Sequence, residues 1–532
     1  MRWSKDMPTV TPSWQTERPL YVDRLPPCNH ACPAGENIQA WLARVQTGEF
    51  HQAWKILVEN NPLPAVMGRA CYHPCESGCN RGKFDQAVNI HAVERFLGDE
   101  AIRCDWQFEP ARPSGRTVLV IGSGPSGLSA AYHLSRFGHK VTIYEAGPAA
   151  GGMMRFGIPK YRLPREVLNA EISRIVNMGV TIQLNTRVDD LGAVIESKQF
   201  DAIFLAVGAH VSKRAYIPAG DASKILDALA VLRNVDGSAP PQLGRRVLVY
   251  GGGNTALDVA RTAKRLGAAD TLIVYRRTRE RMPAHDFEVQ EAIDEGIQFK
   301  WLSTIKEAAG SSFVVEKMRL DEKGFPQPTG EFETIEADSL VLALGQDVDL
   351  SFLGRVPGLE LADGIVTVNA QMMTGHPGVF AGGDMVPAER TVTVAVGHGK
   401  KAARNIDAWM RGEVYQPPAK HELATFEKVI PSYFPDSPAT VQPVLDAARR
   451  QTSFDEVMGG LNEKTTRTEA HRCFSCGNCF ECDTCYEGCP DQAIVKLGAC
   501  KRYEFDYQAC QSCGLCAEQC PCGAIEMVAE PV

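Results

Sequence analysis

The fold of the middle of this chain is decided by the stretch Val118-Leu-Val-Ile-Gly122-Ser-Gly124-Pro-Ser-Gly127-Leu-Ser-Ala130. An apolar strand runs into the pattern G-x-G-x-x-G, and an alanine-rich helix follows. Gly122 permits the tight turn, Gly124 lets the backbone approach a pyrophosphate, and Gly127 lets the helix pack closely on the strand. The free N–H groups at the helix N-terminus attract phosphates. The stretch therefore predicts a dinucleotide site on a parallel α/β sheet.

A carboxylate follows at the position that a bound ribose needs. The next strand, residues 141–144, leads into Glu145, which lies 18 residues after Gly127. An acid about 20 residues beyond the glycines accepts the ribose hydroxyls. Glycine-rich turns are common in ordinary loops, but strand, glycines, helix and acid in register favour the nucleotide site. The expected binding residues are Gly122, Ser123, Gly124, Pro125, Ser126, Gly127, Glu145 and Gly152.

A second stretch, RVLVYGGGNTA at 246–256, repeats the device with Ala256 in the third glycine position. The strand after it, at 271–275, ends in arginines where the first site has an acid. Guanidinium groups bind a ribose 2′-phosphate, which a carboxylate would repel. We therefore predict NADPH here, with NADH as the alternative; a solvated arginine surface is the simpler interpretation, but the position directly after the strand argues against it. The expected residues are Gly251, Gly253, Asn254, Thr255, Ala256, Arg276 and Arg277.

A third motif, GVFAGGD at 378–384, indicates what the first site holds. A strand end and a helix start are expected at 391–400. An acid at a strand end beside a helix N-terminus suits the ribityl hydroxyls and the pyrimidine end of a flavin. We therefore predict FAD at the first site, with further contacts from Gly383, Asp384, Thr391 and Val392.

The cysteines are confined to the two ends of the chain. Of the 18, six lie in residues 1–104 and twelve in residues 473–532. Hydrophobic residues make up 44% and charged residues 23% of the 532, which excludes a disordered chain, and the net charge of −8 gives no support for nucleic-acid binding. The first residues lack a signal peptide's apolar core, and no stretch approaches a membrane span. We expect the reducing cytoplasm, where clustered cysteines indicate metal.

The tail repeats the pattern C-x2-C-x2-C-x3-C-P at 479–490 and at 510–521. This is the signature of a bacterial two-cluster ferredoxin, in which the fourth cysteine of each run binds the other [4Fe–4S] cluster. Zinc is the alternative, but x3-Cys-Pro endings are not zinc spacing. One predicted cluster uses Cys479, Cys482, Cys485 and Cys520, and the other uses Cys510, Cys513, Cys516 and Cys489. The tail has nine acids against three bases, which fits either an acidic docking face or simple solubility.

Five stretches are specific: ERFLGDEA at 94–101, FGIPKYRLPREV at 156–167, GGGNTALDVARTA at 251–263, YRRTRERMPA at 275–284 and GVFAGGD at 378–384. Through them residues 20–410 resemble the small (β) subunit of NADPH-dependent glutamate synthase and its relatives, among them the N-terminal half of dihydropyrimidine dehydrogenase. This resemblance implies a helical iron–sulfur domain followed by an FAD domain into which an NADPH domain is inserted. It also implies one N-terminal [4Fe–4S] cluster held by Cys32, Cys71, Cys75 and Cys79.

This chain departs from the family pattern at its N-terminal cysteines. The family has a cysteine where this chain has Met67, and the family's spacing at Cys71–Cys75 is longer. The family has a second N-terminal cluster, whose leading C-x2-C pair is missing before Cys28. Residues 453–476 resemble the usual lead-in to that pair, moved to the far end of the chain. The hypothesis is a fourth cluster that uses Cys28, Cys473 and Cys476, joined by Glu94; otherwise these are extra thiols beside the ferredoxin clusters. Ordinary thiols are expected at Cys104, Cys500 and Cys522.

The predicted fold class is α/β, with a helical iron–sulfur domain, two nested Rossmann-like domains and a ferredoxin-like α+β domain. The expected boundaries are 1–110 for the helical iron–sulfur domain, 111–240 and 346–412 for the FAD domain, 241–345 for the NAD(P)H domain, 413–472 for a proline-rich linker and 473–532 for the two-cluster domain.

The predicted function follows from electron counts. NADPH gives up two electrons as hydride and an iron–sulfur cluster takes one, so a flavin must stand between them. Hydride transfer needs no protein acid or base, and no catalytic side chain is named. No stretch is left for a substrate domain, so the expected partner is ferredoxin or a larger redox enzyme subunit, such as a 2-oxoacid oxidoreductase or the glutamate synthase large subunit. A stand-alone reductase of a small-molecule acceptor and a non-catalytic redox sensor are the alternatives.

Overall fold

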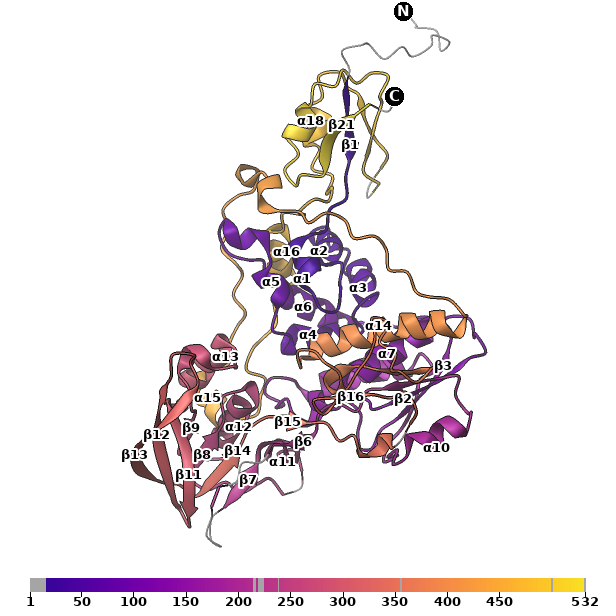
Figure 1. Ribbon diagram of the computed structural model, residues 1–532. Helices are drawn as coiled ribbons and strands as arrows, with labels where there is room; N and C mark the ends of the chain where they lie inside the picture. Colours follow the sequence, from indigo (N-terminus) through magenta and orange to yellow (C-terminus); the bar gives the residue numbers. More distant parts are fainter. Residues whose placement is uncertain are drawn as a thin grey trace, which may run out of the picture.

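The computed structural model describes residues 16–213, 217–218, 224–237, 239–354, 356–498 and 501–530. Figure 1 shows a lobe built from the C-terminal tail at one end, a helical region in the middle, and two regions built on β-sheets side by side at the other end. No helix of the described residues is long and apolar enough to cross a membrane.

The first sheet has five parallel strands in the order β18-β5-β2-β3-β4. Its central strand is apolar and buried because helices cover the sheet, as in doubly wound folds. The strands are β2 (Thr117–Ile121), β3 (Lys140–Tyr144), β4 (Thr181–Gln183), β5 (Ala202–Leu205) and β18 (Val379–Ala381). The helices around it are α7 (Pro125–Arg136), α8 (Met153–Phe156), α9 (Arg165–Val176), α10 (Leu191–Glu196) and α14 (Val392–Met410).

The second sheet also has five parallel strands, in the order β10-β9-β8-β14-β7. An antiparallel sheet of three strands packs its apolar side against it through Phe313 and Val315. The parallel strands are β7 (Ile225–Asp227), β8 (Arg246–Tyr250), β9 (Asp270–Val274), β10 (Gln298–Lys300) and β14 (Ser339–Leu342). The antiparallel strands are β11 (Ser303–Ala309), β12 (Ser312–Leu320) and β13 (Pro326–Glu336). The helices of this region are α11 (Ala228–Asn234), α12 (Asn254–Arg265) and α13 (Asp286–Asp294). Because β7 pairs with β14, this sheet takes in residues before the expected boundary at 241.

The helical region is built from six short helices: α1 (Pro27–Ala31), α2 (Ile38–Gln46), α3 (Phe50–Val58), α4 (Pro64–Ala70), α5 (Pro74–Ser77) and α6 (Ile90–Arg103). α4 and α6 cross with their backbones nearly touching, because a Cβ on Gly98 would lie 2.2 Å from the backbone nitrogen of Ala65. Trp41 and Trp54 are fully buried in its core. Ala470, from α16 (Glu463–His471) near the other end of the chain, belongs to the same core.

The tail lobe contains α17 (Thr484–Glu487), β19 (Ile494–Lys496), β20 (Tyr503–Phe505), α18 (Leu515–Glu518) and β21 (Ile525–Ala529). The N-terminal strand β1 (Glu17–Tyr21) pairs antiparallel with β21, so the two ends of the chain form one small sheet (Figure 1). This pairing was not predicted from the sequence, and it places residues 17–21 in the tail lobe instead of the helical region.

The expected linker does more than connect two parts. Its helix α15 (Ala447–Thr452) lies beside α12, and Glu456 pairs with both Arg69, at 2.7 Å, and Arg95, at 3.0 Å. The backbone N–H of Val457 donates to the carbonyl of Tyr161 at 2.9 Å. This segment therefore ties the helical region to both sheet regions.

Candidate functional site

The first glycine motif has the geometry that a pyrophosphate site requires. Gly122 has φ +104°, and a Cβ there would lie 2.4 Å from the carbonyl oxygen of Ala206. A Cβ on Gly127 would lie 2.0 Å from the carbonyl oxygen of Gly122, which explains the close packing of helix on strand. Gly124 faces open space, and the buried Oγ of Ser126 has no hydrogen-bond partner among the described residues. Open space beside an unpaired hydroxyl and a helix N-terminus fits a bound phosphate.

Glu145 lies at the end of β3, beside the same turn. Its carboxylate accepts hydrogen bonds from the N–H of Ser123 at 2.9 Å and of Gly147 at 2.7 Å, and from the hydroxyl of Ser123 at 2.5 Å. The backbone of Gly152 lies against Gly124, because a Cβ on Gly152 would be 2.7 Å from the Cα of Gly124. The residues expected at this site are thus together, and the contact of Glu145 with a ribose stays a prediction.

The third motif closes the same site. Gly383 and Asp384 form a single turn at the end of β18, and a Cβ on Gly383 would lie 3.1 Å from the Cβ of Ser126. Thr391 caps α14, its hydroxyl accepting from the N–H of Val394 at 3.2 Å. Burial raises the pKa of Asp384. Segments far apart in the sequence therefore meet at one end of the first sheet, as expected for one cofactor site.

The second glycine motif repeats this geometry on the second sheet. A Cβ on Gly251 would lie 2.2 Å from the carbonyl oxygen of Ala343, and Gly253 faces open space. Arg276 and Arg277 follow β9, with Tyr275 between the last residue of the strand, Val274, and Arg276. Arg276 is exposed, and the buried Nε of Arg277 has no hydrogen-bond partner within the described ranges. The guanidinium of Arg277 lies over the ring of Phe325, with its carbon 6.0 Å from the ring centroid. Guanidinium groups after this strand are of the type that binds an anionic group such as a ribose 2′-phosphate.

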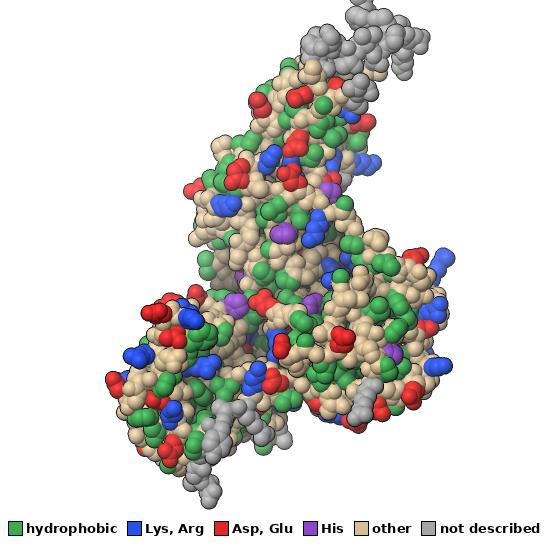
Figure 2. All heavy atoms as spheres, viewed as in Figure 1, with side chains coloured by type: hydrophobic (Ala, Val, Ile, Leu, Met, Phe, Trp, Pro, Cys, Tyr) green, Lys and Arg blue, Asp and Glu red, His purple; other side chains and the backbone are tan. Residues whose placement is uncertain are grey.

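Asn254, at the start of α12, links the second motif to the helical region. Its Nδ2 donates to the hydroxyl of Tyr72 at 2.7 Å, and its Oδ1 accepts from the N–H of His285 at 3.2 Å. The rings of Tyr72 and His285 stack with centroids 3.8 Å apart. Tyr72 follows Cys71, so the nucleotide motif and a cysteine loop share one hydrogen-bonded contact. Figure 2 shows that the surface is hollowed between the two sheet regions.

The N-terminal cysteines fall into two groups that differ from the expected set. Cys28, Cys79, Cys473 and Cys476 line one pocket, together with apolar side chains. Burial raises the pKa of Cys28, and the neighbouring Cys473, Cys79 and Cys476 raise it further. Cys79 therefore lies with the pair from the tail segment, and not with Cys32, Cys71 and Cys75 as predicted.

The second group contains Cys32, Cys71 and Cys75. Burial raises the pKa of each thiol, and the nearby carboxylate of Glu94 raises all three pKa values further. Glu94 is itself buried, and it accepts a hydrogen bond from Nδ2 of Asn61 at 2.8 Å. Buried thiols beside a buried carboxylate are a donor set that a cationic iron core would stabilise. Glu94 was expected to join Cys28, but the structure places it here.

Two short helices divide the cysteines between these groups. Cys28 and Cys32 lie at the two ends of α1, and Cys75 and Cys79 lie at the two ends of α5. Each pair has the spacing C-x3-C, and its two cysteines belong to different groups. Cys28 and Cys79 line the pocket, whereas Cys32 and Cys75 belong to the group with Glu94. The ferredoxin runs use the same spacing, with Cys485 and Cys489 across α17. This shared spacing is the sequence signal that would have separated Cys75 from Cys79.

The tail cysteines come together in the two predicted sets. Cys482, Cys485 and Cys520 act on the pKa of Cys479, which burial raises to about 11. The second set lines one pocket: Cys489, Cys510, Cys513 and Cys516. Cys522, expected to be an ordinary thiol, is buried with its Sγ 3.8 Å from that of Cys520. The Cys522 thiol lowers the pKa of Cys520 to about 6. Cys104 is exposed, and Cys500 lies outside the described residues.

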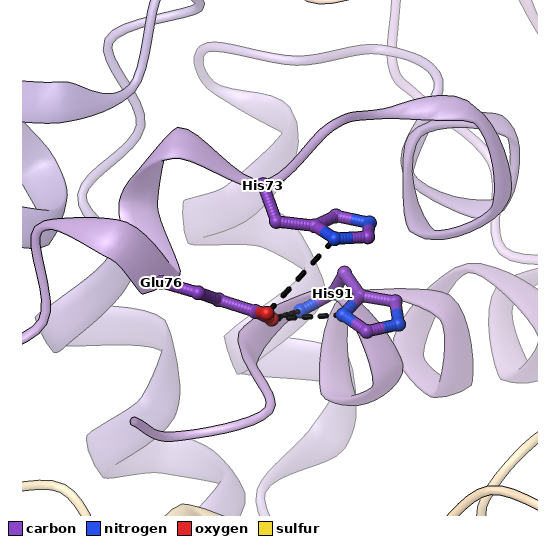
Figure 3. A group of neighbouring side chains, drawn as sticks. All are labelled: His73, Glu76 and His91. Atoms are coloured by element: carbon purple, nitrogen blue, oxygen red, sulfur yellow. Dashed lines mark hydrogen bonds and ion pairs between the residues drawn. The ribbon is translucent and has the colours of Figure 1, made fainter. Parts of the chain in front are cut away.

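His73, Glu76 and His91 form a group beside Cys75 whose donor set is one that metal ions use (Figure 3). Nδ1 of His91 lies 2.8 Å from Oε1 of Glu76, and Nδ1 of His73 lies 3.9 Å from Oε2. The imidazole rings stack with centroids 3.7 Å and planes 15° apart. The lone pair of each imidazole nitrogen lies in the plane of its ring. Because the two ring planes are nearly parallel, these lone pairs do not point to one shared metal ion about 2 Å from each nitrogen. In this arrangement the group braces the Cys71–Cys75 loop against α6.

Comparison with protein families matches residues 116–399 to the pyridine nucleotide-disulphide oxidoreductases. Residues 13–106 match dihydropyrimidine dehydrogenase domain II, a 4Fe-4S cluster domain, and residues 503–526 match a 4Fe-4S binding domain. These matches confirm the predicted fold class and the predicted cofactor types.

Three curated relatives have redox functions. The beta subunit of NADP(+)-dependent formate dehydrogenase from Moorella thermoacetica is 37% identical over 500 residues, which cover 85% of this chain and 70% of that protein. The beta subunit of NADPH-Fe(3+) oxidoreductase from Geobacter sulfurreducens is 33% identical over 513 residues, covering 85% and 75%. The NADPH glutamate synthase small chain of Escherichia coli is 32% identical over 430 residues, covering 72% and 89%.

The last relative confirms the family resemblance drawn from the sequence motifs. The geometry of two dinucleotide motifs on parallel sheets agrees with the match over the middle of the chain. This chain is a member of the pyridine nucleotide-disulphide oxidoreductase family, with a 4Fe-4S domain on either side of the nucleotide-binding region.

Proposed function

We propose that this chain is the electron-transfer subunit of a larger redox enzyme, carrying electrons between NADPH, FAD, four [4Fe–4S] clusters and a partner. The observation that carries the proposal is the pocket lined by Cys28, Cys79, Cys473 and Cys476. This pocket draws on both ends of the chain. Cys473 and Cys476 thereby take the place of the C-x2-C pair that is missing before Cys28, and they complete a second N-terminal cluster site.

The four ligand sets follow from the groups described above. The set beside α14 is Cys32, Cys71, Cys75 and Glu94; the shared set is Cys28, Cys79, Cys473 and Cys476; the tail sets are Cys479, Cys482, Cys485 with Cys520, and Cys510, Cys513, Cys516 with Cys489. Glu94 would take the place of a fourth cysteine. Burial and the neighbouring carboxylates raise its pKa, and a bound cationic iron core would stabilise its deprotonated form as a ligand.

The sets form a continuous series. α1 and α5 each connect the set beside α14, here called the first set, to the shared set across about one helical turn. Two residues, Gly477 and Asn478, separate Cys476 of the shared set from Cys479 of the first tail set. The helices α17 and α18 then join the two tail sets. Electrons would therefore pass along the long axis seen in Figure 1, between the first sheet and the tail lobe.

The chain's own residues provide binding and orientation. When bound, a flavin converts between hydride transfer and single-electron transfer. The glycine turns and the N-termini of α7 and α12 would hold the pyrophosphates, and Arg276 and Arg277 would select the 2′-phosphate of NADPH. Thr391 and Val392, at the start of α14, would contact the flavin. No side chain is required to move a proton.

The proposed partner is a catalytic redox subunit that meets the tail lobe. Two of the relatives are named as beta subunits and one as a small chain. A 2-oxoacid oxidoreductase and a glutamate synthase large subunit are catalytic subunits of this kind, and a ferredoxin is the alternative partner. In the tail set of Cys489, Cys510, Cys513 and Cys516, the exposed cysteine is Cys513. Acidic side chains lie on the visible face of this lobe in Figure 2.

An anaerobic iron count followed by NADPH addition tests the proposal. Four clusters require about 16 irons per chain, and three clusters require about 12. NADPH is expected to bleach the flavin absorbance and then produce the signals of reduced clusters in electron paramagnetic resonance (EPR). About 12 irons would overturn the shared site, and an unbleached flavin would overturn the reductase function. Turnover with a small acceptor but not with ferredoxin would favour a stand-alone reductase.

A further inference from the structure

The helix α14 lies between the first dinucleotide motif and the loop of the first cysteine set (Figure 1). On one side, a Cβ on Gly399 would lie 2.3 Å from the carbonyl oxygen of Ser126 in α7. On the other side, a Cβ on Gly397 would lie 2.2 Å from the carbonyl oxygen of Pro33, which follows Cys32. Residues two apart face opposite sides of a helix. The two glycines thus let one helix touch both sites, backbone to backbone.

Thr393 is the side chain of α14 that contacts a cysteine of this set. Its hydroxyl donates to the Sγ of Cys71 at 3.0 Å, and the Sδ of Met67 lies 3.6 Å away. The side chain is buried, with 5% of the residue exposed. Thr393 directly follows Thr391 and Val392, the two residues expected at the flavin. The hydroxyl therefore joins α14 directly to a cysteine of this set.

We infer that the Thr393 hydroxyl tunes the reduction potential of the cluster bound by Cys32, Cys71, Cys75 and Glu94. This inference rests on the proposed function. Reduction adds one electron to a cluster and increases the negative charge on its sulfur ligands. A hydroxyl that donates to one of those sulfurs stabilises the reduced form more than the oxidised form. Thr393 is a positioning residue, since no bond to it forms or breaks.

The test compares Thr393→Val with Thr393→Ser in the complete, anaerobically loaded protein. Valine keeps the shape of threonine and removes the hydroxyl, whereas serine keeps the hydroxyl. A potentiometric titration with dithionite and mediators, followed by EPR, measures each cluster without using NADPH. Cys71→Ser identifies the signal that belongs to this cluster. We expect Thr393→Val to make this cluster's reduction about tenfold less favourable, which is ~59 mV for one electron, and Thr393→Ser to stay near the wild type.

The matched control is Thr271→Val in β9. The Thr271 hydroxyl is buried and has no partner among the described residues, so its loss tests a threonine-to-valine change elsewhere. An unchanged potential in a fully loaded Thr393→Val protein would overturn the inference. If that variant loads fewer irons, pulsed EPR of the wild type decides instead: an exchangeable proton coupled to this cluster, altered in Thr393→Ser, supports the hydrogen bond, and its absence overturns it. Because the titration bypasses NADPH, a failed reductase function would not affect this outcome.

Discussion

Asn80 donates a hydrogen bond from Nδ2 to the Sγ of Cys476, with 3.4 Å between the atoms, although 396 residues separate the two in sequence. Asn80 directly follows Cys79, so this bond lies inside the shared cysteine set. Nearby, Nη1 of Arg81 donates to the carbonyl of Arg472 at 2.9 Å, and Gln39 donates to the hydroxyl of Ser475 at 3.3 Å. The segment that carries Cys473 and Cys476 is therefore held in place by residues of the N-terminal region.

Replacing Cys473 and Cys476 together by serine is expected to remove one cluster. Iron should fall from about 16 to about 12 per chain, because serine is a poor substitute for two of four thiolates. The flavin should stay bound, since the first sheet is separate. Iron analysis and flavin absorbance of the purified protein measure both. Cys104→Ser, at an exposed thiol, is the control and should leave the iron unchanged. Equal iron in the double variant and the control would contradict the shared site.

Arg276→Ala is expected to weaken NADPH use without affecting NADH. A charge-assisted hydrogen bond contributes about 1.5–3 kcal/mol, so KM for NADPH should rise roughly 10- to 100-fold. Steady-state rates with both nucleotides and an artificial acceptor measure the change. Arg319→Ala is a matched control, because Arg319 is an exposed arginine on β12 of the same region. A parallel rise in KM for both nucleotides would argue against a role in recognising the 2′-phosphate.

Glu295→Gln is expected to destabilise the second sheet region. The carboxylate is fully buried between two guanidinium groups, at 2.6 Å from Arg265 and 2.7 Å from Arg261. Neutralising it leaves buried positive charge, which costs about 3–5 kcal/mol. Denaturant unfolding, followed by the tryptophan fluorescence to which Trp301 of this region contributes, measures the loss. Glu331→Gln removes an exposed pair with Lys317 and should change little. Equal midpoints for the two variants would refute this account.

The same carboxylate predicts a pH dependence. Burial raises the pKa of Glu295, but hydrogen bonds from Arg265 and Arg261 outweigh it, so the pKa is lowered overall. A lowered pKa contributes stability that is complete above the unfolded value near 4.5, and this stability is lost as the pH falls through the folded value. The unfolding midpoint of the wild type should therefore drop in acid more steeply than that of Glu295→Gln. Parallel pH curves would contradict the assignment.

Tyr21→Ala is expected to loosen the tail lobe. The ring of Tyr21 stacks on Phe505 with centroids 4.8 Å apart, and its hydroxyl lies 3.5 Å from the Sγ of Cys485. Loss of this half-buried ring should cost ~2 kcal/mol. The rate at which a chelator removes iron from the oxidised protein measures the effect. Tyr21→Phe keeps the stack and should resemble the wild type. If the two variants release iron equally fast, the hydroxyl and not the stack holds the lobe.

Much of the site could be predicted because its parts are local. Gly122 and Gly251 adopt positive φ, and Gly127 meets a backbone carbonyl, for reasons written into one short segment. The continuous apolar strands predicted the parallel sheets. The ferredoxin sets were also predicted, since their spacing is read within one tail. The family resemblance implied that Cys79 shares a cluster with Cys75, but Cys75 lies in α5, Cys79 follows the end of that helix, and the two belong to different groups.

The sequence by itself determined the two nucleotide turns and the cysteine runs, because backbone sterics and ligand spacing act over a few residues. The tertiary structure decided that Cys79 joins Cys28, Cys473 and Cys476, that β1 completes the tail lobe, and that Thr393 lies against Cys71. These contacts join segments hundreds of residues apart. They depend on how whole elements pack, and the glycines of α14, α4 and α6 permit that packing by letting backbones touch. No local pattern records which distant surface a segment will meet.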